Sequence, residues 1–308
     1  MPPDHHGHDH HHHHHTPADF GGAFLAGIAL NTAFIVAEVA FGLRANSLAL
    51  LADAGHNAGD VFGLVLSLAA AVLGKRRPSA RFTYGFGGFS IIAATVNAVV
   101  LLVAVGAIGF ESLLRLARPE QTGGTTMMAV AAFGVLVNGA TALLFIKGRK
   151  HDLNVRSAYL HMVADAAISL GVVVAGGVVF YTHWARLDPL ASLVISGLIV
   201  VSTFRILKES LSLSLQAVPP SIDPAQVKAR LGARPGVLEV HDLHLWALNT
   251  AAAAASVHLV MAGGHPGDAF IKDIAQELEH DFNISHTTVQ IELGDGGTSC
   301  PFAPDHVV

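Results

Sequence analysis

Long apolar stretches without charged side chains alternate with short polar ones along the first two thirds of the chain. Residues 82–110 and 121–146 contain no Lys, Arg, Asp or Glu. Each window is long enough to cross the roughly 30 Å hydrocarbon layer of a bilayer as a helix. The apolar segments lie at residues 20–43, 48–74, 89–116, 125–147, 158–182 and 189–207. The pattern therefore predicts a domain of six transmembrane helices.

The composition changes to that of a small soluble domain beyond about residue 221. Pro219-Pro220 interrupts the chain there, and Asp223-Pro224 has the residue types of a helix N-cap followed by a first-turn proline. We therefore expect a disordered His-rich tail at residues 1–18, a membrane domain at 19–215, a small domain at 216–295 and a C-terminal tail at 296–308.

The small domain alternates between strand-like and helix-like patterns. The expected elements after the first short helix are strands at residues 237–248 and 256–261, a helix at 268–281 and a strand at 287–293. Because the alanine run at residues 251–255 has low strand propensity, we place the hairpin connection near residues 249–252. The order αββαβ predicts a compact α+β domain.

The overall composition supports a membrane protein and argues against a soluble enzyme. Hydrophobic residues make up 52% of the chain, charged residues only 13%, and the mean hydropathy is +0.51. The net charge is -5, and the basic residues are spread over connections, so nucleic-acid binding has no electrostatic support. The single Cys300 permits no intrachain disulfide. Its simplest interpretation is a free thiol, and a role as a metal ligand stays open.

The distribution of Lys and Arg predicts the orientation in the membrane. One side carries Lys75, Arg76, Arg77, Arg81, Lys147, Arg149, Lys150 and Arg156, and the other carries Arg44, Arg115, Arg118 and Arg186. The more basic connections should be cytoplasmic. With an even number of spans, both termini are then cytoplasmic, and we expect a multi-pass protein of the inner (plasma) membrane. The first apolar segment has no basic region before it, so we expect it to remain as a helix rather than to be a signal peptide.

Ionisable residues inside two apolar segments indicate a metal site. Such side chains cost roughly 2.5–3.5 kcal/mol near the bilayer centre, and most of those that are found there are functional. His56 and Asp60 are four residues apart in the second segment, and His161 and Asp165 have the same spacing in the fifth. Each pair lies on one face of its helix. Two imidazoles and two carboxylates facing each other suit tetrahedral Zn²⁺, whereas Cu(I) would prefer sulfur ligands.

The alternative is that each pair is a His–Asp hydrogen bond that ties helices together. The repetition of the same residue types, order and spacing in two helices favours a shared ligand site. Asp53 precedes His56 by three residues, and we assign it to helix packing or gating rather than to the ligands.

Several motifs resemble those of the cation diffusion facilitator family of metal transporters. They are Ser47-Leu-Ala-Leu-Leu-Ala-Asp53-Ala-Gly-His56-Asn57-Ala-Gly-Asp60, His161-Met-Val-Ala-Asp165, Arg81-Phe-Thr-Tyr84-Gly-Phe, Glu111-Ser-Leu-Leu-Arg115 and Asp188-Pro189-Leu-Ala-Ser192, within residues 20–293. The resemblance implies a homodimer with a ferredoxin-like cytoplasmic domain that exports divalent metal in exchange for protons. His at both helix positions implies zinc, with cadmium or cobalt as further substrates.

The resemblance also marks residues outside the membrane site. His241, His258 and His286 match positions where relatives bind regulatory zinc between subunits, although these side chains could equally be polar strand residues on a solvated face. His244 and His265 are weaker candidates. Other positions depart from the family pattern. Relatives often have a basic residue and a Glu where this chain has Gly88 and Ser90, and the connection at residues 76–81 lacks the ligands of a loop metal site.

The N-terminal tail is rich in histidine. His5, His6, His8 and His10 to His15 are interspersed with Asp4, Gly7 and Asp9. Such a segment binds metal loosely. The run resembles a purification tag, but the interspersed residues favour a native metal-collecting tail.

The expected function is a proton-coupled antiporter that exports Zn²⁺ by alternating access. An imidazole with an ordinary pKa near physiological pH binds zinc only when it is deprotonated, so protons and zinc compete for the site. No phosphate-binding motif and no His-Glu-x-x-His motif is present, so we expect neither an ATP-driven pump nor a hydrolase. No organic cofactor is expected. A passive metal channel or a membrane metal sensor remains the alternative.

Overall fold

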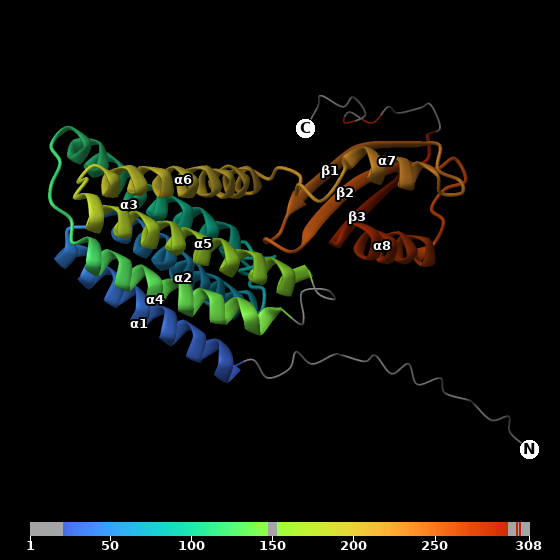
Figure 1. Cartoon of the computed structure of the whole chain (residues 1–308). Coiled ribbons are helices and arrows are strands. Elements are labelled where there is room, and N and C mark those ends of the chain that lie inside the picture. Colours follow the sequence, from blue (N-terminus) through green and yellow to red (C-terminus); the bar gives the residue numbers. More distant parts are fainter. Residues whose placement is uncertain (1–20, 147–152, 295–299, 301, 303–308) are drawn as a thin grey trace, which may run out of the picture.

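A computed structural model describes residues 21–146, 153–294, 300 and 302 of the chain. The six long helices are α1 (Gly21–Ala45), α2 (Leu48–Gly74), α3 (Phe89–Ala117), α4 (Gly124–Phe145), α5 (Leu153–Thr182) and α6 (Leu187–Ser214). They correspond in order to the predicted apolar segments and lie side by side (Figure 1). All but α1 contain a described stretch that is long and apolar enough to cross a membrane. The six-helix domain is confirmed.

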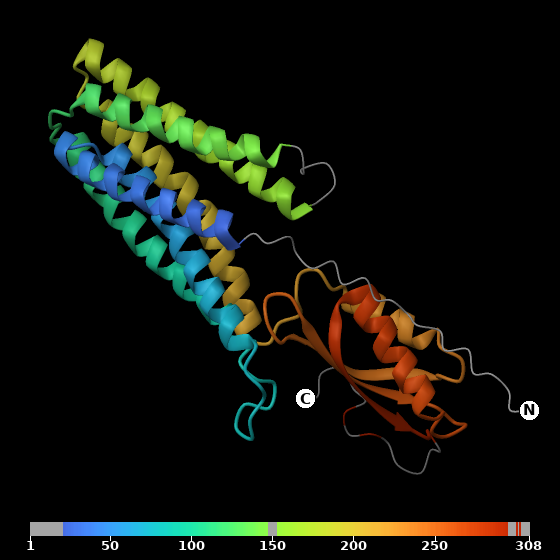
Figure 2. The ribbon, with the colours of Figure 1, turned by 90° about the horizontal axis from the view of Figure 1, so that it is seen from below.

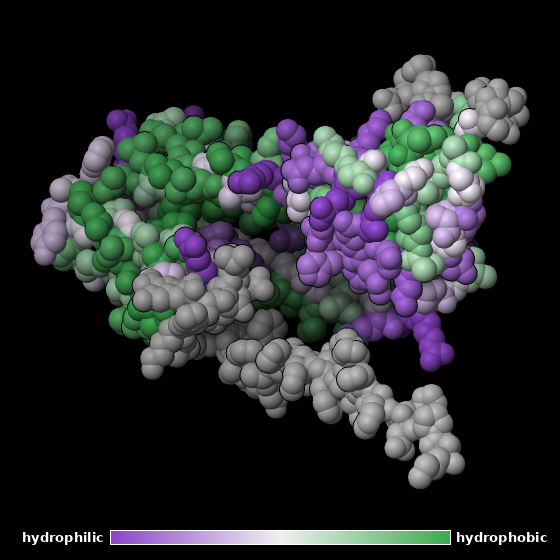
Figure 3. Space-filling view, turned by 90° about the vertical axis from the view of Figure 1, so that its right-hand side faces the viewer, coloured by the Kyte–Doolittle hydropathy of each residue, from purple (hydrophilic) through white to green (hydrophobic). Residues whose placement is uncertain are grey.

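The outer surfaces of these helices are apolar. Val103, Leu136 and Val201 are 69%, 68% and 74% exposed. Exposure of so many apolar side chains is unfavourable in water and favourable in lipid. Hydrophobic residues cover the helices in the space-filling view, whereas hydrophilic residues gather over the small domain (Figure 3).

A buried carboxylate on α6 fixes the start of α2. Ser47 is the N-cap of α2, and its hydroxyl donates to Asp188 Oδ1 at 2.6 Å. The backbone N–H groups of Leu48 and Ala49 donate to the same carboxylate at 2.8 and 3.3 Å. These N–H groups have no partner within the helix, and the helix dipole also favours an anion at this end. The contact therefore holds the first turns of α2 and α6 together.

The helices form two groups. α2 and α3 pack on each other and on α6, whereas α4 packs mainly on α5. The α4–α5 contact is close, because a Cβ atom at Gly176 would lie 2.9 Å from the backbone nitrogen of Met128. Figure 2 shows the α4–α5 pair diverging from the other helices toward the end that faces the small domain. α2 and α5 contact each other only locally, and the residues of the predicted site lie at this junction.

The C-terminal domain has the predicted αββαβ order. Its elements are α7 (Pro224–Gly232), β1 (Glu239–Ala247), β2 (Ala253–Val260), α8 (Asp268–Phe282) and β3 (Ile284–Glu292). The sheet order is β1-β2-β3, with β1 antiparallel and β3 parallel to the central strand β2. Asp223 caps α7 by accepting a bond from the N–H of Ala225, and Pro224 opens the helix, as expected. The ferredoxin-like fold class is confirmed.

The position of β2 corrects one expectation. The strand begins at Ala253 rather than at residue 256. Ala253, Ala254 and Ala255 are at most 2% exposed in the middle of the sheet, so burial between two neighbouring strands outweighs their low strand propensity. β3 also begins three residues before its expected start at 287. The hairpin connection is where we predicted it, because the Asn249 side chain accepts bonds from the N–H groups of Ala251 and Ala252.

The small domain also contacts the first turn of α3 and the connection that precedes it. The N–H of Thr250 donates to Ser90 Oγ at 3.1 Å. The ring of Tyr84 meets the ring of His286 edge-on, with centroids 5.4 Å apart. The two domains therefore touch through the start of α3 and the connection that precedes it.

Candidate metal centre

The four predicted membrane residues come together between α2 and α5. Within each helix the ring nitrogen and the carboxylate lie one turn apart, with His56 Nε2 3.9 Å from Asp60 Oδ2 and His161 Nε2 3.6 Å from Asp165 Oδ2. The contacts between the helices are shorter. His56 Nε2 is 3.3 Å from Asp165 Oδ1, and His161 Nε2 is 3.2 Å from Asp60 Oδ2.

The His–Asp distances in this crosswise arrangement are close to those of a tetrahedral site. Donor atoms about 2.0–2.2 Å from a central ion lie about 3.3–3.6 Å apart in a tetrahedron. One donor atom each from His56, Asp60 and Asp165 lie within 4.8 Å of one another. His161 Nε2 lies within 3.6 Å of an oxygen of each aspartate but outside this group of three, and its ring centroid is 6.0 Å from that of His56. We call these four residues the transport quartet.

Exposure is uneven within the transport quartet. The side chains of Asp165 and His56 are 2% and 15% exposed, whereas those of Asp60 and His161 are 35% and 43% exposed. Asp60 follows His56 along α2, and His161 precedes Asp165 along α5, so both exposed residues lie toward the end of the helices that faces the small domain. The quartet is therefore more exposed on that side than on the other.

Asp53 lies outside the quartet, although its spacing from His56 places it on the same face of α2. It is fully buried and accepts a hydrogen bond from Ser169 Oγ of α5 at 3.0 Å. The side chain therefore links α2 to α5 one turn away from His56.

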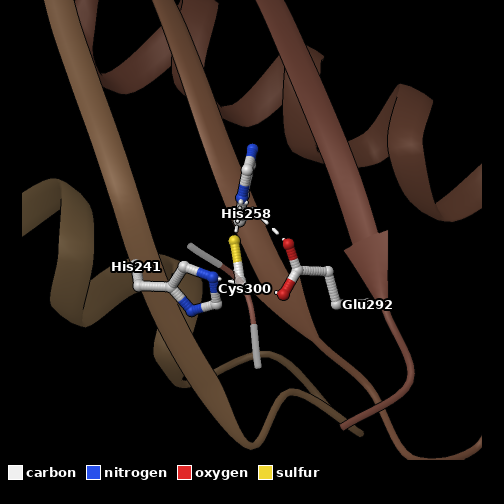
Figure 4. A group of neighbouring side chains, drawn as sticks. All are labelled: His241, His258, Glu292 and Cys300. Carbon is white, nitrogen blue, oxygen red and sulfur yellow. Dashed lines mark hydrogen bonds and ion pairs between the residues drawn. The ribbon is translucent and has the colours of Figure 1, made fainter. Parts of the chain in front are cut away.

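A second group of possible ligands lies in the small domain (Figure 4). Its members are His241 on β1, His258 on β2, Glu292 at the end of β3 and Cys300, and one donor atom from each lies within 4.8 Å of the others. His241 and His258 are direct partners in the β1–β2 register. We call these residues the domain cluster.

Glu292 is the centre of the domain cluster. One of its oxygens is 2.9 Å from His258 Nδ1 and the other is 3.3 Å from His241 Nε2. Cys300 Sγ lies 3.5 Å from His258 Nδ1. His241 is 4% exposed, yet neither of its ring nitrogens makes a hydrogen bond within the described part of the chain. A buried imidazole without hydrogen bonds is costly, and a metal ion would satisfy one of its nitrogens.

The charges in the domain cluster also suit a cation. Burial acts to raise the pKa of Glu292, but hydrogen bonds from Cys300 and Gln290 and the two nearby histidines outweigh it and lower the pKa. Burial raises the pKa of the Cys300 thiol, and the Glu292 carboxylate adds to this increase. Without metal, Cys300 is therefore a neutral thiol beside a carboxylate, and a bound metal would replace its proton.

The sequence identified only part of the domain cluster. His241 and His258 meet, but His286 contacts Tyr84 and pairs with Ala254 in the sheet, away from the other two histidines. Glu292 was not predicted, and for Cys300 the role of a metal ligand was only left open beside that of a free thiol. Alternation along β3 places Glu292 on the same face as His286, but only the strand register shows that this carboxylate reaches His258. His244 bonds to Asp242. The N-terminal histidines lie outside the described residues.

Comparison with known proteins identifies the family. Residues 24–213 match the model of the cation efflux transmembrane domain, and residues 219–293 match that of the cation efflux protein cytoplasmic domain. The chain belongs to the cation efflux family, and it is a membrane transporter rather than an enzyme. This result confirms the resemblance drawn from the sequence motifs.

Individual relatives cover most of the chain. The metal cation efflux system protein CzcD of Cupriavidus metallidurans is 36% identical over 267 residues, which is 86% of this chain and 84% of that protein. The zinc transporter ZitB of Escherichia coli is 34% identical over 85% of this chain and 84% of its own length. A cadmium, cobalt and zinc/H(+)-K(+) antiporter of Bacillus subtilis is 31% identical over 85% of each chain. A solved structure of the metal-bound C-terminal domain of CzcD is 37% identical, with a TM-score of 0.22, and covers 23% of this chain and 100% of that one.

Proposed function

We propose that the protein exports divalent metal, with Zn²⁺ as its main substrate, in exchange for protons at the transport quartet. The observation that carries this proposal is the crosswise geometry, in which each of the two imidazoles from α2 and α5 lies 3.2 to 3.9 Å from both carboxylates. This spacing and these donor types suit tetrahedral zinc. Relatives named as zinc transporters and as a zinc antiporter support the same substrate and exchange.

The direction of transport follows from the side on which the quartet is more exposed. Asp60 and His161, the more exposed members of the quartet, lie nearer the small-domain end of α2 and α5 than His56 and Asp165, and this domain matches a family of cytoplasmic domains. We therefore assign this side, and both termini, to the cytoplasm of a plasma-membrane protein. The described arrangement then receives metal from the cytoplasm, and a movement between α2 and α5 would open the quartet to the other side.

Proton exchange follows from the ligand chemistry. Zinc binds to neutral imidazole, so His56 and His161 must lose any proton before they coordinate the ion. On the far side of the membrane, protonation of the same nitrogens would release zinc. The pH gradient then drives export without ATP.

We further propose that the domain cluster binds a regulatory or structural Zn²⁺. His241, His258, Glu292 and Cys300 offer two nitrogens, an oxygen and a sulfur, which are the donor types of closed zinc sites. The small domain also supports a homodimer, because it matches the family's cytoplasmic domain, and this pairing would bring two domain clusters into one molecule. His286 remains a candidate ligand only for a site between subunits.

Zinc flux into proteoliposomes under an imposed pH gradient tests the main proposal. We expect uptake against a zinc gradient in the native protein and loss of uptake in Asp165→Ala. Asp273→Ala, at an exposed position on α8, is the matched control and should transport normally. Flux that ignores the pH gradient, or that survives Asp165→Ala, contradicts the proposal. Flux only down the zinc gradient would indicate a channel instead.

A further inference from the structure

A groove of about 520 Å³ runs between α1 and α4 on the outer surface of the membrane domain. The two helices lie side by side there (Figure 1). The apolar walls of the groove include Phe34, Ala37 and Phe41 of α1 and Ala129 and Phe133 of α4. Phe41 and Phe133 are 44% and 52% exposed, so the groove opens to the medium that surrounds the helices. In a bilayer this medium is hydrocarbon. We call this feature the α1–α4 groove.

Two contacts fix how α1 and α4 run past each other. The ring centroids of Phe34 and Phe133 lie 5.9 Å apart. Farther along, the N–H of Gly123, just before α4, donates to the carbonyl of Ala45, the last residue of α1, at 2.9 Å. The helices are therefore antiparallel, with the end of α1 beside the first turn of α4. This end of the membrane domain lies away from the small domain (Figure 1).

The α1–α4 groove becomes polar at this end. Thr125 and Thr126 line it in the first turn of α4. The groove-lining residues of α1 are spaced three and four residues apart, and Arg44 follows Phe41 by three, so it continues the same helix face. Arg44 is exposed and forms no ion pair with the described residues. A positive charge and two hydroxyl groups therefore flank one end of an otherwise apolar groove.

This combination matches the chemistry of a phospholipid. The groove follows α1 for seven residues, about 10 Å, and so takes part of one acyl chain. Arg44 lies in the last turn of α1, where long basic side chains reach the headgroup level of a bilayer. A guanidinium binds a phosphate group through charge-assisted hydrogen bonds. A free anion would use only the polar end, and an apolar helix of another protein would use only the walls.

We propose that the α1–α4 groove binds one phospholipid, with an acyl chain along Phe34 and Phe133 and the phosphate group at Arg44, Thr125 and Thr126. Because α1 packs on α2 and α4 packs mainly on α5, this lipid contacts both groups of helices. The inference is independent of the proposed antiport, since none of these residues belongs to the transport quartet.

The test counts the lipids bound to the full chain by native mass spectrometry. The probe is phosphatidylglycerol with two oleoyl chains, added to delipidated protein in detergent. Dioleoylglycerol, which has the same chains but no phosphate group, is the comparison. We expect one tightly bound phosphatidylglycerol per chain. Dioleoylglycerol should bind about tenfold more weakly, because it lacks the charge-assisted hydrogen bonds to the phosphate group.

Two variants at exposed positions test the two parts of the site. Ala129→Trp fills the groove and should abolish the tight binding, whereas Val201→Trp, at an exposed position on α6, is the matched control. Arg44→Gln removes the charge and should weaken the binding of phosphatidylglycerol about tenfold. Arg186→Gln, at an exposed position just before α6, is its matched control. Both controls should bind the lipid as the native protein does.

Several results would overturn the inference. Native affinity in Ala129→Trp or in Arg44→Gln would do so, and so would equal binding of the two lipids. Unchanged lipid binding together with loss of a dimer in Ala129→Trp would assign the groove to a second copy of the chain instead. The comparison of the two lipids needs only the native protein, so it decides the matter if a variant does not fold. Zinc flux that ignores a pH gradient would overturn the antiport and leave this inference intact.

Discussion

The Asp188 carboxylate holds α2 against α6, and its removal should destabilise the membrane domain without touching the four residues of the transport quartet. The carboxylate accepts three bonds, from the Ser47 hydroxyl and from the N–H groups of Leu48 and Ala49. Asp188 and Ser47 are fully buried. Asp188→Ala leaves all three donors without an acceptor, whereas Asp188→Asn keeps one carbonyl oxygen that can accept from the hydroxyl or the first N–H group.

The size of the effect can be worked out from these contacts. A buried donor without a partner costs about 1–3 kcal/mol, so three donors at the lower value give about 3 kcal/mol for Asp188→Ala. In a domain of this size 1 kcal/mol changes the Tm by about 2–4 °C. We therefore expect a decrease of at least about 6 °C for Asp188→Ala, and a smaller decrease for Asp188→Asn.

The assay is thermal unfolding of the full chain in detergent, with and without zinc. Asp273→Ala is the matched control, because its side chain is exposed on α8. The variants should bind zinc at low temperature as the native protein does, since Asp188 lies outside the transport quartet. A Tm for Asp188→Ala equal to that of Asp273→Ala would show that the buried carboxylate does not hold the two helices together.

Three further changes test other parts of the structure. His56→Asp should keep transport but weaken the preference for zinc over cadmium and cobalt, because an oxygen donor replaces one of the two nitrogen donors. An unchanged flux ratio among the three metals would contradict this. Zinc should protect Cys300 from a thiol reagent in the full chain, and His258→Ala should abolish the protection; equal reaction rates with and without zinc would remove Cys300 from the domain cluster. Gly176→Ala should destabilise the protein by about 1–3 kcal/mol, because its Cβ would meet the α4 backbone, whereas Gly171→Ala has open space and should not; equal melting temperatures would refute the close approach.

The sequence was most informative where a single helix decides the geometry. The spacing of His56 and Asp60 places both on one face, and the same spacing in α5 gave the other half of the quartet. The sequence could not show that each histidine lies closer to the aspartate of the opposite helix. Which aspartate lies closer depends on how α2 and α5 are rotated about their axes. The contact with Asp188 helps to set the rotation of α2, and the packing of α4 on α5 helps to set that of α5.

Contacts between distant segments explain the remaining omissions. Glu38 is the only acidic residue in its apolar segment, which is a sign of function by itself, but its hydrogen bond from Asn57 becomes visible only when α1 and α2 pack. Cys300 reaches His258 through the fold of the small domain, across 42 positions of sequence. The start of β2 was misplaced because alanine is chosen there for its small size between β1 and β3, which propensity alone does not describe.

The two groups of helices explain how one movement could act on the whole transport quartet. α2 is tied to α6 through Asp188 and packs on α3, and α5 is packed closely on α4 through Gly176. Each group contributes one histidine and one aspartate, and the short contacts all cross from one group to the other. A shift of α4 and α5 against the rest therefore lengthens both crosswise contacts together, so the site would lose its metal in a single step. On this basis Gly176→Ala should slow zinc turnover more than it weakens zinc binding. A variant with weaker binding and unchanged turnover would contradict a quartet divided between two rigid groups.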